Sequence, residues 1–378
     1  MAGHPEFPLR DGLHYLNHAA VAPLPRRTAE AIAAFAHEAV SEGTWNYRRW
    51  EQTEQALREQ LQRLIGAESP DDIALVKSTS EALSFIAHGL DWIPGDNIVT
   101  FREEFPSNRW VWESLRRLGV ETRLAHLTGV EDPEEALFSF VDDRTRLVSV
   151  SSVQYGTGFR VDLPRIGQYC REREILFCVD AIQSLGALPF DVAQIGCDFV
   201  AADGHKWMLA PEGLGLFWVR PDLRDKLQLV EIGWHSHAPL KDYDQIEAPL
   251  APGARRFECG SPNMLGIHAL HASLSLIEEV GIKTIEDQIL RNSALLIELI
   301  SASRGFELLT VQAPRRLSGI VTFRHRKYSP AHITHHLRSH SVLAAVRGGG
   351  VRFSPHFYNT EEELQHVWEF VKQVGRKS

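Results

Sequence analysis

Three polar groups between residues 78 and 206 lie at or shortly after the ends of apolar runs that read as buried strands. Lys206 comes shortly after FVAAD at 199–203, Asp180 ends ILFCVD, and the hydroxyl-rich run STS at 78–80 follows IALVK. In open α/β sheets, ligands bind outside the carboxyl ends of the strands. We therefore expect an amine, a carboxylate and a hydroxyl-rich helix start to gather at one edge of a sheet.

The chemistry of these groups suits a phosphate, an aldehyde and a pyridine ring. A helix that begins near Ser78 offers free N–H groups and its positive dipole end to an anion such as phosphate. Burial lowers the pKa of a lysine, so Lys206 becomes a nucleophilic amine that can form an imine with an aldehyde. A buried Asp180 favours the protonated form of a pyridine nitrogen and keeps the ring an electron sink. The three functions belong to one molecule, pyridoxal 5′-phosphate.

Each group also has a purely structural explanation when it is taken alone. Ser78 and Glu81 fit a capping box, S-x-x-E, in which the serine closes a helix. An aspartate at the end of a strand is usually a turn or cap residue, and His205-Lys206 could be solvated surface. The occurrence of all of them at one predicted sheet edge favours the cofactor site.

The elements that must position these residues alternate in the manner of an α/β protein. Between about residues 70 and 220, apolar β-rich runs alternate with helical patterns, which predicts a mostly parallel sheet covered by helices. Two amphipathic helices are expected before it, the second ending at Gly66. The predicted strands lie at 73–78, 97–101, 121–127, 145–153, 175–180, 199–203 and 214–219.

After residue 255 the pattern changes to long helical stretches followed by short strands and two more helices, which indicates a smaller α+β unit. With 378 residues, the length is consistent with about two domains. We predict an N-terminal arm at 1–20 that contributes to the small domain or the active site, a large cofactor-binding domain at 21–254, and a small α+β domain at 255–378.

Composition makes several classes of partner improbable. Forty basic and 49 acidic side chains give a net charge of −9, which offers no electrostatic footprint for nucleic acid or an anionic membrane. No apolar run approaches the ~18 residues of a membrane span, and the first residues lack a signal-peptide pattern, so we expect a soluble, cytoplasmic protein.

Neither a disulfide framework nor a metal site is expected. The four cysteines are scattered without a C-x-x-C pair. A histidine-rich stretch has the i, i+4 spacing that could bind a metal, but no carboxylate is placed to complete such a site. Its histidines are His332, His335, His336 and His340.

The order of motifs along nearly the whole chain resembles the class V aminotransferases, which are fold type I enzymes dependent on pyridoxal phosphate. This group includes cysteine desulfurases, kynureninase and isopenicillin N epimerase. The resemblance implies the fold type I architecture, bound pyridoxal 5′-phosphate, an amino acid or other amine as substrate, and a homodimer with shared active sites. The motifs are YLNHAAVAPLP at 15–25, STSEAL, EEFPSN, VQYGTG, VDAIQSLG, ADGHKWMLAPEGLG, RRFECGSPN and VRFSPHFYNTEEE at 351–363.

The resemblance also implies roles for individual residues. Lys206 matches the Schiff-base lysine, Asp180 the partner of the pyridine nitrogen, and Gln183 the donor to the ring's phenolic oxygen. Arg352 matches the arginine that binds the substrate α-carboxylate, a task that suits a bidentate guanidinium. The other implied contacts are Ser78, Thr79, Ser80 and His205 to the phosphate, Phe105 stacked on the ring, Gly260 and Ser261 to the phosphate of the neighbouring subunit, and His18, Tyr47, Tyr155 and Trp234 to the substrate.

Three of these positions have alternatives that the sequence leaves open. Phe105 could be a core aromatic residue, and Arg352 an ordinary strand-edge arginine. The glycine run at 348–350 could be a hairpin turn or a loop that gates access for substrate.

Within the family, the sequence argues against some reactions but does not decide among transamination, racemisation and elimination. Cysteine desulfurases carry a nucleophilic cysteine shortly before the carboxylate-binding arginine, and the segment 339–355 has none. They also place a histidine where this chain has Phe105, which cannot transfer protons, so a persulfide route is disfavoured. His205 replaces the tyrosine of kynureninase, and YLNHAAVAPLP with EFPSN is most similar to the branch of isopenicillin N epimerase. We predict an aminotransferase, with a lyase or epimerase as the alternative. A non-enzymatic scaffold would have no reason to keep Lys206, Asp180 and Arg352 together.

Overall fold

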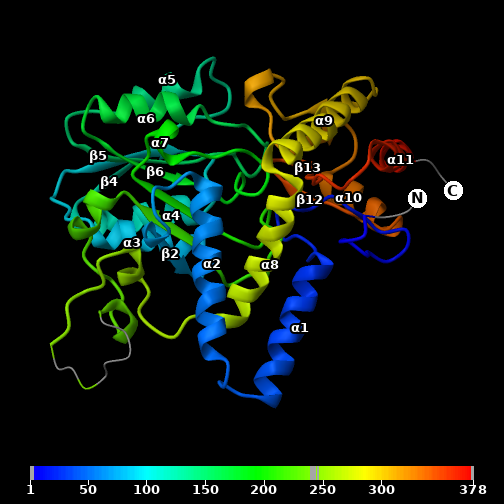
Figure 1. Cartoon of the computed structure of the whole chain (residues 1–378). Coiled ribbons are helices and arrows are strands. Elements are labelled where there is room, and N and C mark those ends of the chain that lie inside the picture. Colours follow the sequence, from blue (N-terminus) through cyan, green and yellow to red (C-terminus); the bar gives the residue numbers. More distant parts are fainter. Residues whose placement is uncertain (1–3, 239–243, 245–246, 376–378) are drawn as a thin grey trace.

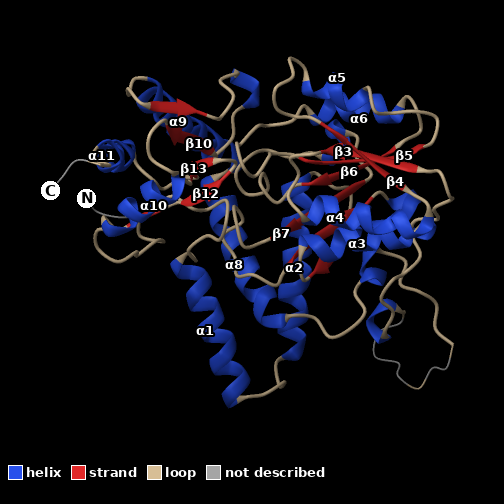
Figure 2. Ribbon diagram, turned by 180° about the vertical axis from the view of Figure 1, so that it is seen from behind, coloured by secondary structure: helices blue, strands red, loops and turns tan. Residues whose placement is uncertain are grey.

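The computed structural model describes residues 4–238, 244 and 247–375 (Figure 1). Its largest element is a seven-stranded sheet with helices on both faces (Figure 2). The strands are β2 (Ile73–Val76), β3 (Asn97–Phe101), β4 (Glu121–Ala125), β5 (Thr145–Ser151), β6 (Leu176–Asp180), β7 (Phe199–Asp203) and β8 (Gly215–Val219). Their order in the sheet is β2-β8-β7-β6-β5-β3-β4, and all neighbours are parallel except those that involve β8. The predicted mostly parallel sheet is confirmed.

Both faces of this sheet are buried, which explains why its strands read as continuous apolar runs. Side chains of a strand alternate between the two faces. In β7, Phe199 and Ala201 pack into one core cluster, whereas Val200 and Ala202 pack into another. Each face therefore needs its own cover of helices.

Helices α3 and α4 cover the first of these faces, and α2, α6 and α8 contribute to the second. Helix α2 ends at Gly66, which has the left-handed φ of +66° that the sequence predicts for its cap. The helices around the sheet are α1 (Arg26–Ser41), α2 (Tyr47–Ile65), α3 (Thr79–Gly89), α4 (Ser107–Glu113), α5 (Pro133–Phe138), α6 (Leu163–Arg171), α7 (Val192–Ile195) and α8 (Met264–Val280).

The C-terminal part of the chain forms a second, four-stranded antiparallel sheet of order β12-β13-β10-β9 with its own core. The N-terminal segment joins this part, because β1 (His14–Tyr15) pairs in parallel with β11 (Val342–Leu343). Helix α8 lies along α1 and α2 (Figure 1). The domain boundary expected at 254/255 stays a prediction. The remaining elements are α9 (Ile282–Ser301), β9 (Phe306–Leu308), β10 (Val321–His325), α10 (Pro330–Ser339), β12 (Ala345–Arg347), β13 (Gly350–Phe353) and α11 (Glu361–Lys372).

The glycine run is a hairpin turn between β12 and β13. Arg347 and Gly350 are the last paired residues, so Gly348 and Gly349 are the two turn residues. Both have positive φ, +58° and +77°, which suits glycine in a two-residue hairpin. Of the two alternatives from the sequence, the structure contains the hairpin.

Within the described part of the chain, no helix combines the length and the apolar character that crossing a membrane requires.

Candidate active site

A cavity of about 320 Å³ lies at the carboxyl ends of β2, β6 and β7, where the sequence places the polar groups. Loops of the large sheet form most of its wall, and the N-terminal segment at 19–21 and the β12–β13 hairpin with Arg352 contribute the rest. Because strands that run in the same direction end at the same edge, residues far apart in the chain meet here. The structure brings together ten of the predicted site residues: Ser78, Thr79, Ser80, Phe105, Tyr155, Asp180, Gln183, His205, Lys206 and Arg352.

Lys206 is held almost out of contact with solvent at this cavity, with 9% of its surface exposed. The turn before it is tight, since a Cβ on Gly204 would lie 2.9 Å from the carbonyl oxygen of Leu214. Its Nζ lies 5.6 Å from the centre of the Phe105 ring. Burial lowers the pKa of Lys206 to about 8, although the nearby charge of Asp180 opposes the shift. A substantial fraction of this amine is therefore neutral near physiological pH.

Asp180 ends β6 and is buried, with one carboxylate oxygen accepting a hydrogen bond from the Ile182 N–H at 3.0 Å. Burial raises the pKa of Asp180 to about 6, against the opposing effects of that hydrogen bond and of Lys206. A positive partner in the cavity would favour its charged form.

Glu104 is a second buried carboxylate beside Asp180, and the sequence reasoning missed it. Its oxygens accept hydrogen bonds from the N–H of Ser151, at 2.7 Å, and from the Ser151 hydroxyl. Burial raises the pKa of Glu104 to about 7, and the charge of Asp180 adds to the shift. The sequence feature that could have indicated Glu104 is its position directly before Phe105 in EEFPSN, three residues after the end of β3.

The start of helix α3 forms one wall of the cavity. The Ser78 hydroxyl accepts a hydrogen bond from the Glu81 N–H at 3.2 Å, so this side chain caps the helix. The Thr79 hydroxyl accepts from the N–H of Asp203 at 3.0 Å and fixes the helix start against the end of β7. The first backbone N–H groups of a helix have no partner within it, and with the helix dipole they make a site for an anion.

Further polar groups stand beside this helix start. The Ser80 hydroxyl donates to the Ser107 hydroxyl at 2.8 Å, and Ser107 also lines the cavity. The Nδ1 atom of His205 lies 3.1 Å from a carboxylate oxygen of Asp203. Gln183 is fixed at the opposite wall. Its amide nitrogen donates to the carbonyl of Ala19 at 3.1 Å, and its amide oxygen accepts from the Trp207 indole N–H at 2.9 Å.

Arg352 is buried, with 1% of its surface exposed, and it lines the same cavity. Its Nη1 donates to the carbonyl of Tyr155 at 2.7 Å, whereas Nε and Nη2 have no hydrogen-bond partner within the described structure. Burial lowers the pKa of Arg352 to about 10, and the charge of Arg347 acts in the same direction. A buried guanidinium with free donors is costly unless an anion pairs with it, so the arrangement favours a carboxylate ligand.

The loop at 155–158 is fastened to the C-terminal part of the chain through its backbone. The side chain of Tyr155 contacts the Phe105 ring edge-on, with ring centres 5.2 Å apart. Because Arg352 bonds the carbonyl of Tyr155, these two residues are positioned together. The four successive carbonyls from Tyr155 to Gly158 accept hydrogen bonds from Arg352 Nη1 (2.7 Å), Thr322 Oγ1 (2.6 Å), Thr310 Oγ1 (2.6 Å) and Ser318 Oγ (2.7 Å), in that order.

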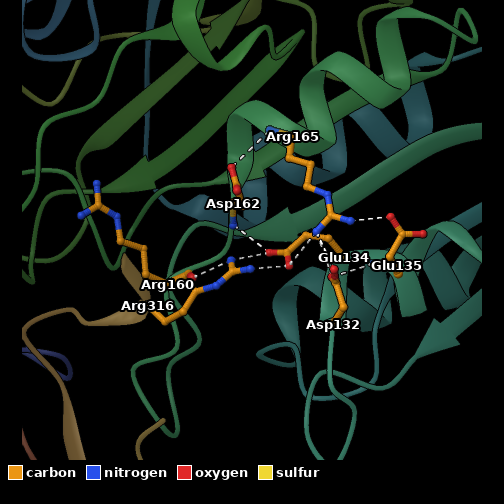
Figure 3. Close-up of polar contacts among 7 residues, drawn as sticks. All are labelled: Asp132, Glu134, Glu135, Arg160, Asp162, Arg165 and Arg316. Carbon is orange, nitrogen blue, oxygen red and sulfur yellow. Dashed lines mark hydrogen bonds and ion pairs between the residues drawn. The ribbon is translucent and has the colours of Figure 1, made fainter. Parts of the chain in front are cut away.

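A buried ion pair continues this attachment beyond the loop (Figure 3). Glu134, which has no exposed surface, accepts two hydrogen bonds from Arg316, at 2.6 and 2.7 Å. It also accepts from the N–H of Asp162 at 2.8 Å, and Nη1 of Arg165 lies 4.0 Å away. Glu134 belongs to α5 and Arg316 to the segment before β10, so the pair joins the large sheet's helices to the C-terminal part.

Comparisons with known proteins decide the family. Residues 14–367 match the sequence profile described as Aminotransferase class-V. The chain belongs to this family. It is 31% identical to a probable cysteine desulfurase of Methanothermobacter thermautotrophicus, with 97% of this chain and 96% of that protein aligned. It is 30% identical to an isopenicillin N epimerase of Streptomyces clavuligerus, over 93% and 92% of the two chains, and to an uncharacterized aminotransferase of Bacillus subtilis, over 91% and 90%.

Solved structures agree on the fold of this class V protein. It aligns with a structure of the cystine C-S lyase C-DES in complex with cysteine persulfide, with a TM-score of 0.90, 24% identity and coverage of 96% and 97% of the two chains. A C-DES variant with glycine linked to its pyridoxal phosphate aligns with a TM-score of 0.93 and 23% identity, over 99% and 100%. The architecture is that of fold type I pyridoxal-phosphate enzymes, as the sequence predicts.

Class V enzymes depend on pyridoxal 5′-phosphate, and the residues of the cavity fit this cofactor. The start of α3 with its hydroxyls would hold the phosphate, Lys206 the aldehyde carbon, and Asp180 the ring nitrogen. Phe105 is 40% exposed and lines the cavity, so it is not a core aromatic residue. The unpartnered nitrogens of Arg352 remain available for a second anion, which would be the substrate.

The predicted contact of His18 with the substrate of this class V enzyme stays a prediction, and in this structure the ring is bonded within the protein. The ring has no exposed surface. Its Nδ1 lies 2.8 Å from the carbonyl of Ser354, and its Nε2 lies 2.7 Å from the Tyr358 hydroxyl. Because both nitrogens are bonded within the protein, His18 holds the N-terminal segment to the chain after β13.

Four other predicted residues do not reach Lys206 within one chain. Tyr47, Trp234 and Ser261 line a separate cavity of about 770 Å³, and Gly260 precedes Ser261 in the sequence. The prediction that Gly260 and Ser261 serve a neighbouring subunit is compatible with this placement and stays a prediction.

The sequence reasoning also missed Arg347, which lines the Lys206 cavity from the hairpin. The sequence feature that could have indicated Arg347 is its position immediately before the glycine run and five residues before Arg352.

Proposed function

We propose that this class V enzyme is an aminotransferase of an α-amino acid, with Lys206 as the covalent attachment point of pyridoxal phosphate and Arg352 as the receptor for the substrate α-carboxylate. The observation that carries the proposal is the shared cavity of a buried lysine and a buried arginine with two unpartnered nitrogens. The first group suits a carbonyl carbon, and the second suits a carboxylate.

When bound, pyridoxal phosphate supplies an electron-withdrawing ring that stabilises negative charge at the α-carbon of an amino acid. Lys206 has a pKa of about 8, so its Nζ can both remove and return a proton at that carbon. Asp180 would hold the proton on the ring nitrogen. Arg352 would orient the amino acid through two parallel hydrogen bonds to its carboxylate.

The groups in the cavity are sufficient for transamination and give no support to two of its alternatives, two-base epimerisation and the persulfide route. Transamination needs one acid–base group that serves two nearby carbons, and Lys206 can serve both. Epimerisation in which a second group protonates the opposite face would need another acid at the cavity, and Phe105, which the family resemblance places on the cofactor ring, carries no exchangeable proton.

A persulfide route also lacks support, although relatives include probable cysteine desulfurases. Cys170, Cys178 and Cys197 are buried, and burial raises the pKa of each thiol. The Sγ of Cys259 lies 3.4 Å from a carboxylate oxygen of Glu231, and its thiol pKa is raised by burial and by that carboxylate. None of the four cysteines lines the Lys206 cavity. Within one chain, a nucleophilic thiolate is therefore not provided there.

Covalent attachment is tested by borohydride reduction of the purified protein followed by peptide mass spectrometry. A pyridoxyl group is expected on the peptide with Lys206, and its loss in Lys206→Ala. The variant Lys226→Ala, which changes an exposed lysine, is the matched control and should keep the label. Labelling at another lysine in the wild-type protein would contradict the proposed role of Lys206.

The reaction is tested with a panel of amino acids, each supplied with a 2-oxo acid as amino-group acceptor. An aminotransferase produces a new amino acid and a new 2-oxo acid in equal amounts. Ammonia with a shortened product would instead identify a lyase, and the enantiomer of the substrate an epimerase.

A homodimer with shared sites is part of this proposal. It is supported by the separation of Tyr47, Trp234 and Ser261 from Lys206 within one chain, because a second copy would be needed to bring them to the cofactor. Analytical ultracentrifugation should give twice the chain mass of 42.6 kDa. A fully active species of 42.6 kDa would contradict it.

A further inference from the structure

Arg347 stands at the Lys206 cavity without an acidic partner in the described part of the chain. The hydrogen bond that its side chain makes there is a local one, from Nη1 to the carbonyl of Val346 at 2.8 Å. Its charge acts on both Lys206 and Arg352, whose pKa values it lowers. Arg347 is exposed, so its guanidinium is hydrated and is available to an anion that enters the cavity.

The register of the hairpin aims Arg347 toward the same side as Arg352. Ala345 is paired with Arg352, and Arg347 with Gly350, and paired residues of a ladder share a face. Since side chains alternate along each strand, all four residues belong to one face of the hairpin. Arg347 and Arg352 are diagonal neighbours, a relation that separates their Cα atoms by about 7–8 Å.

Small residues keep the space between the two guanidiniums open. Arg347 faces a glycine across the ladder, and Arg352 faces an alanine. The tip of the hairpin is fixed against the loop at 155–158, because a Cβ on Gly348 would lie 2.6 Å from the carbonyl oxygen of Gly156. The backbone positions from which the two arginine side chains start are thereby fixed.

The carboxylates that line the cavity belong to other walls. Asp180 and Asp203 end strands of the large sheet, and Asp203 lies beside His205. Glu212 is exposed on the turn after Lys206, and within the described residues no ion pair joins it to Arg347 or Arg352. The hairpin side of the cavity is therefore cationic.

We infer that Arg347 forms a second anion subsite, which binds a carboxylate on the side chain of the substrate while Arg352 binds the α-carboxylate. The substrate class is then an amino acid with two carboxylates. This inference rests on the proposed function for the assignment of Arg352, and it adds the residue that selects among amino acids.

The test compares two substrates of the holoenzyme. Glutamate has a carboxylate on its side chain, and norvaline has an uncharged side chain of similar length. Arg347→Gln should lower kcat/KM for glutamate by about tenfold or more, the effect of losing one charge-assisted hydrogen bond, and change kcat/KM for norvaline by less than about twofold. Arg326→Gln removes an exposed arginine directly after β10 and is the control. It should change kcat/KM for neither substrate. An equal loss with both substrates would place Arg347 on the α-carboxylate and overturn the inference, as would no loss with either.

A second measurement separates this inference from the proposed reaction. Glutarate carries two carboxylates and no amine, and butyrate carries one. Glutarate should raise the thermal unfolding midpoint of the purified protein more than butyrate does, and Arg347→Gln should abolish that difference. If no amino acid is turned over but the glutarate effect depends on Arg347, the reaction fails and the subsite stands. If glutarate and butyrate act alike on the wild-type protein, the subsite fails.

Discussion

The substitution Arg316→Met should reduce stability strongly, because it leaves Glu134 charged and buried without its main partner. Glu134 has no exposed surface, and Arg316 supplies two of its hydrogen bonds. Breaking a buried ion pair from one side costs about 3–5 kcal/mol. The N–H of Asp162 remains at 2.8 Å and Arg165 at 4.0 Å, so the lower end of this range is expected.

This cost can be converted into a change of melting temperature. Unfolding entropy of ~2.1 cal/mol/K per residue gives about 0.8 kcal/mol per degree for this chain. A loss of about 3 kcal/mol therefore lowers the melting temperature by about 4 °C. Differential scanning calorimetry at one scan rate measures this for wild type and variants.

Two variants serve as controls for this measurement. Arg324→Met breaks an exposed pair with Glu307, which water and salt screen, so the melting temperature should shift by about 1 °C or less. The double variant Glu134→Gln/Arg316→Met removes the stranded charge and should recover part of the loss. The reasoning is refuted if Arg316→Met is no less stable than Arg324→Met.

Three further results are expected. Arg352→Gln should raise KM for amino acids by about tenfold or more while the protein keeps its bound cofactor, as judged by visible absorption, and loss of the cofactor would instead indicate a structural task. Because the pKa of Lys206 is about 8, the rate at which cofactor-free protein binds pyridoxal phosphate covalently should rise with pH up to about 8 and then level off, and a rise that continued to pH 10 would contradict the lowered pKa. The pKa of Glu104 is raised from 4.5 to about 7, so the folded protein binds an extra proton between these values and loses stability as the pH rises through them. Glu104→Gln should therefore gain melting temperature relative to wild type between pH 5 and 8, and a constant difference would mean that Glu104 titrates normally.

Much of the large sheet could be predicted from the sequence because both of its faces are buried. Burial on both faces produces uninterrupted apolar runs, and the polar residues that interrupt them mark the strand ends. Lys206 and Asp180 stood out for that reason. They are local signals, since Asp180 ends its strand and Lys206 lies three residues after the end of its own.

The residues that the sequence reasoning missed depend on contacts between distant segments. The fold reveals Glu104 as a buried carboxylate because β5 brings Ser151 to it. It reveals Arg347 as a neighbour of Arg352 because the register of the hairpin puts both on one face. The prediction for His18 came from the family resemblance alone. In the structure, Ser354 and Tyr358 satisfy its ring inside the protein, and these contacts between distant segments could not be predicted from the sequence.

The loop at 155–158 is fastened through backbone carbonyls, which every amino acid possesses. A change of the Tyr155 side chain therefore leaves its attachment intact, since Arg352 bonds the carbonyl of that residue and not its ring. Gly158 has no such freedom, because its φ is +79° and a Cβ there would lie 2.2 Å from the carbonyl oxygen of Ile320. Position 155 can thus be exchanged to reshape the wall of the cavity while the frame that carries it stays in place, and it is a natural point at which relatives of this protein could acquire new substrates.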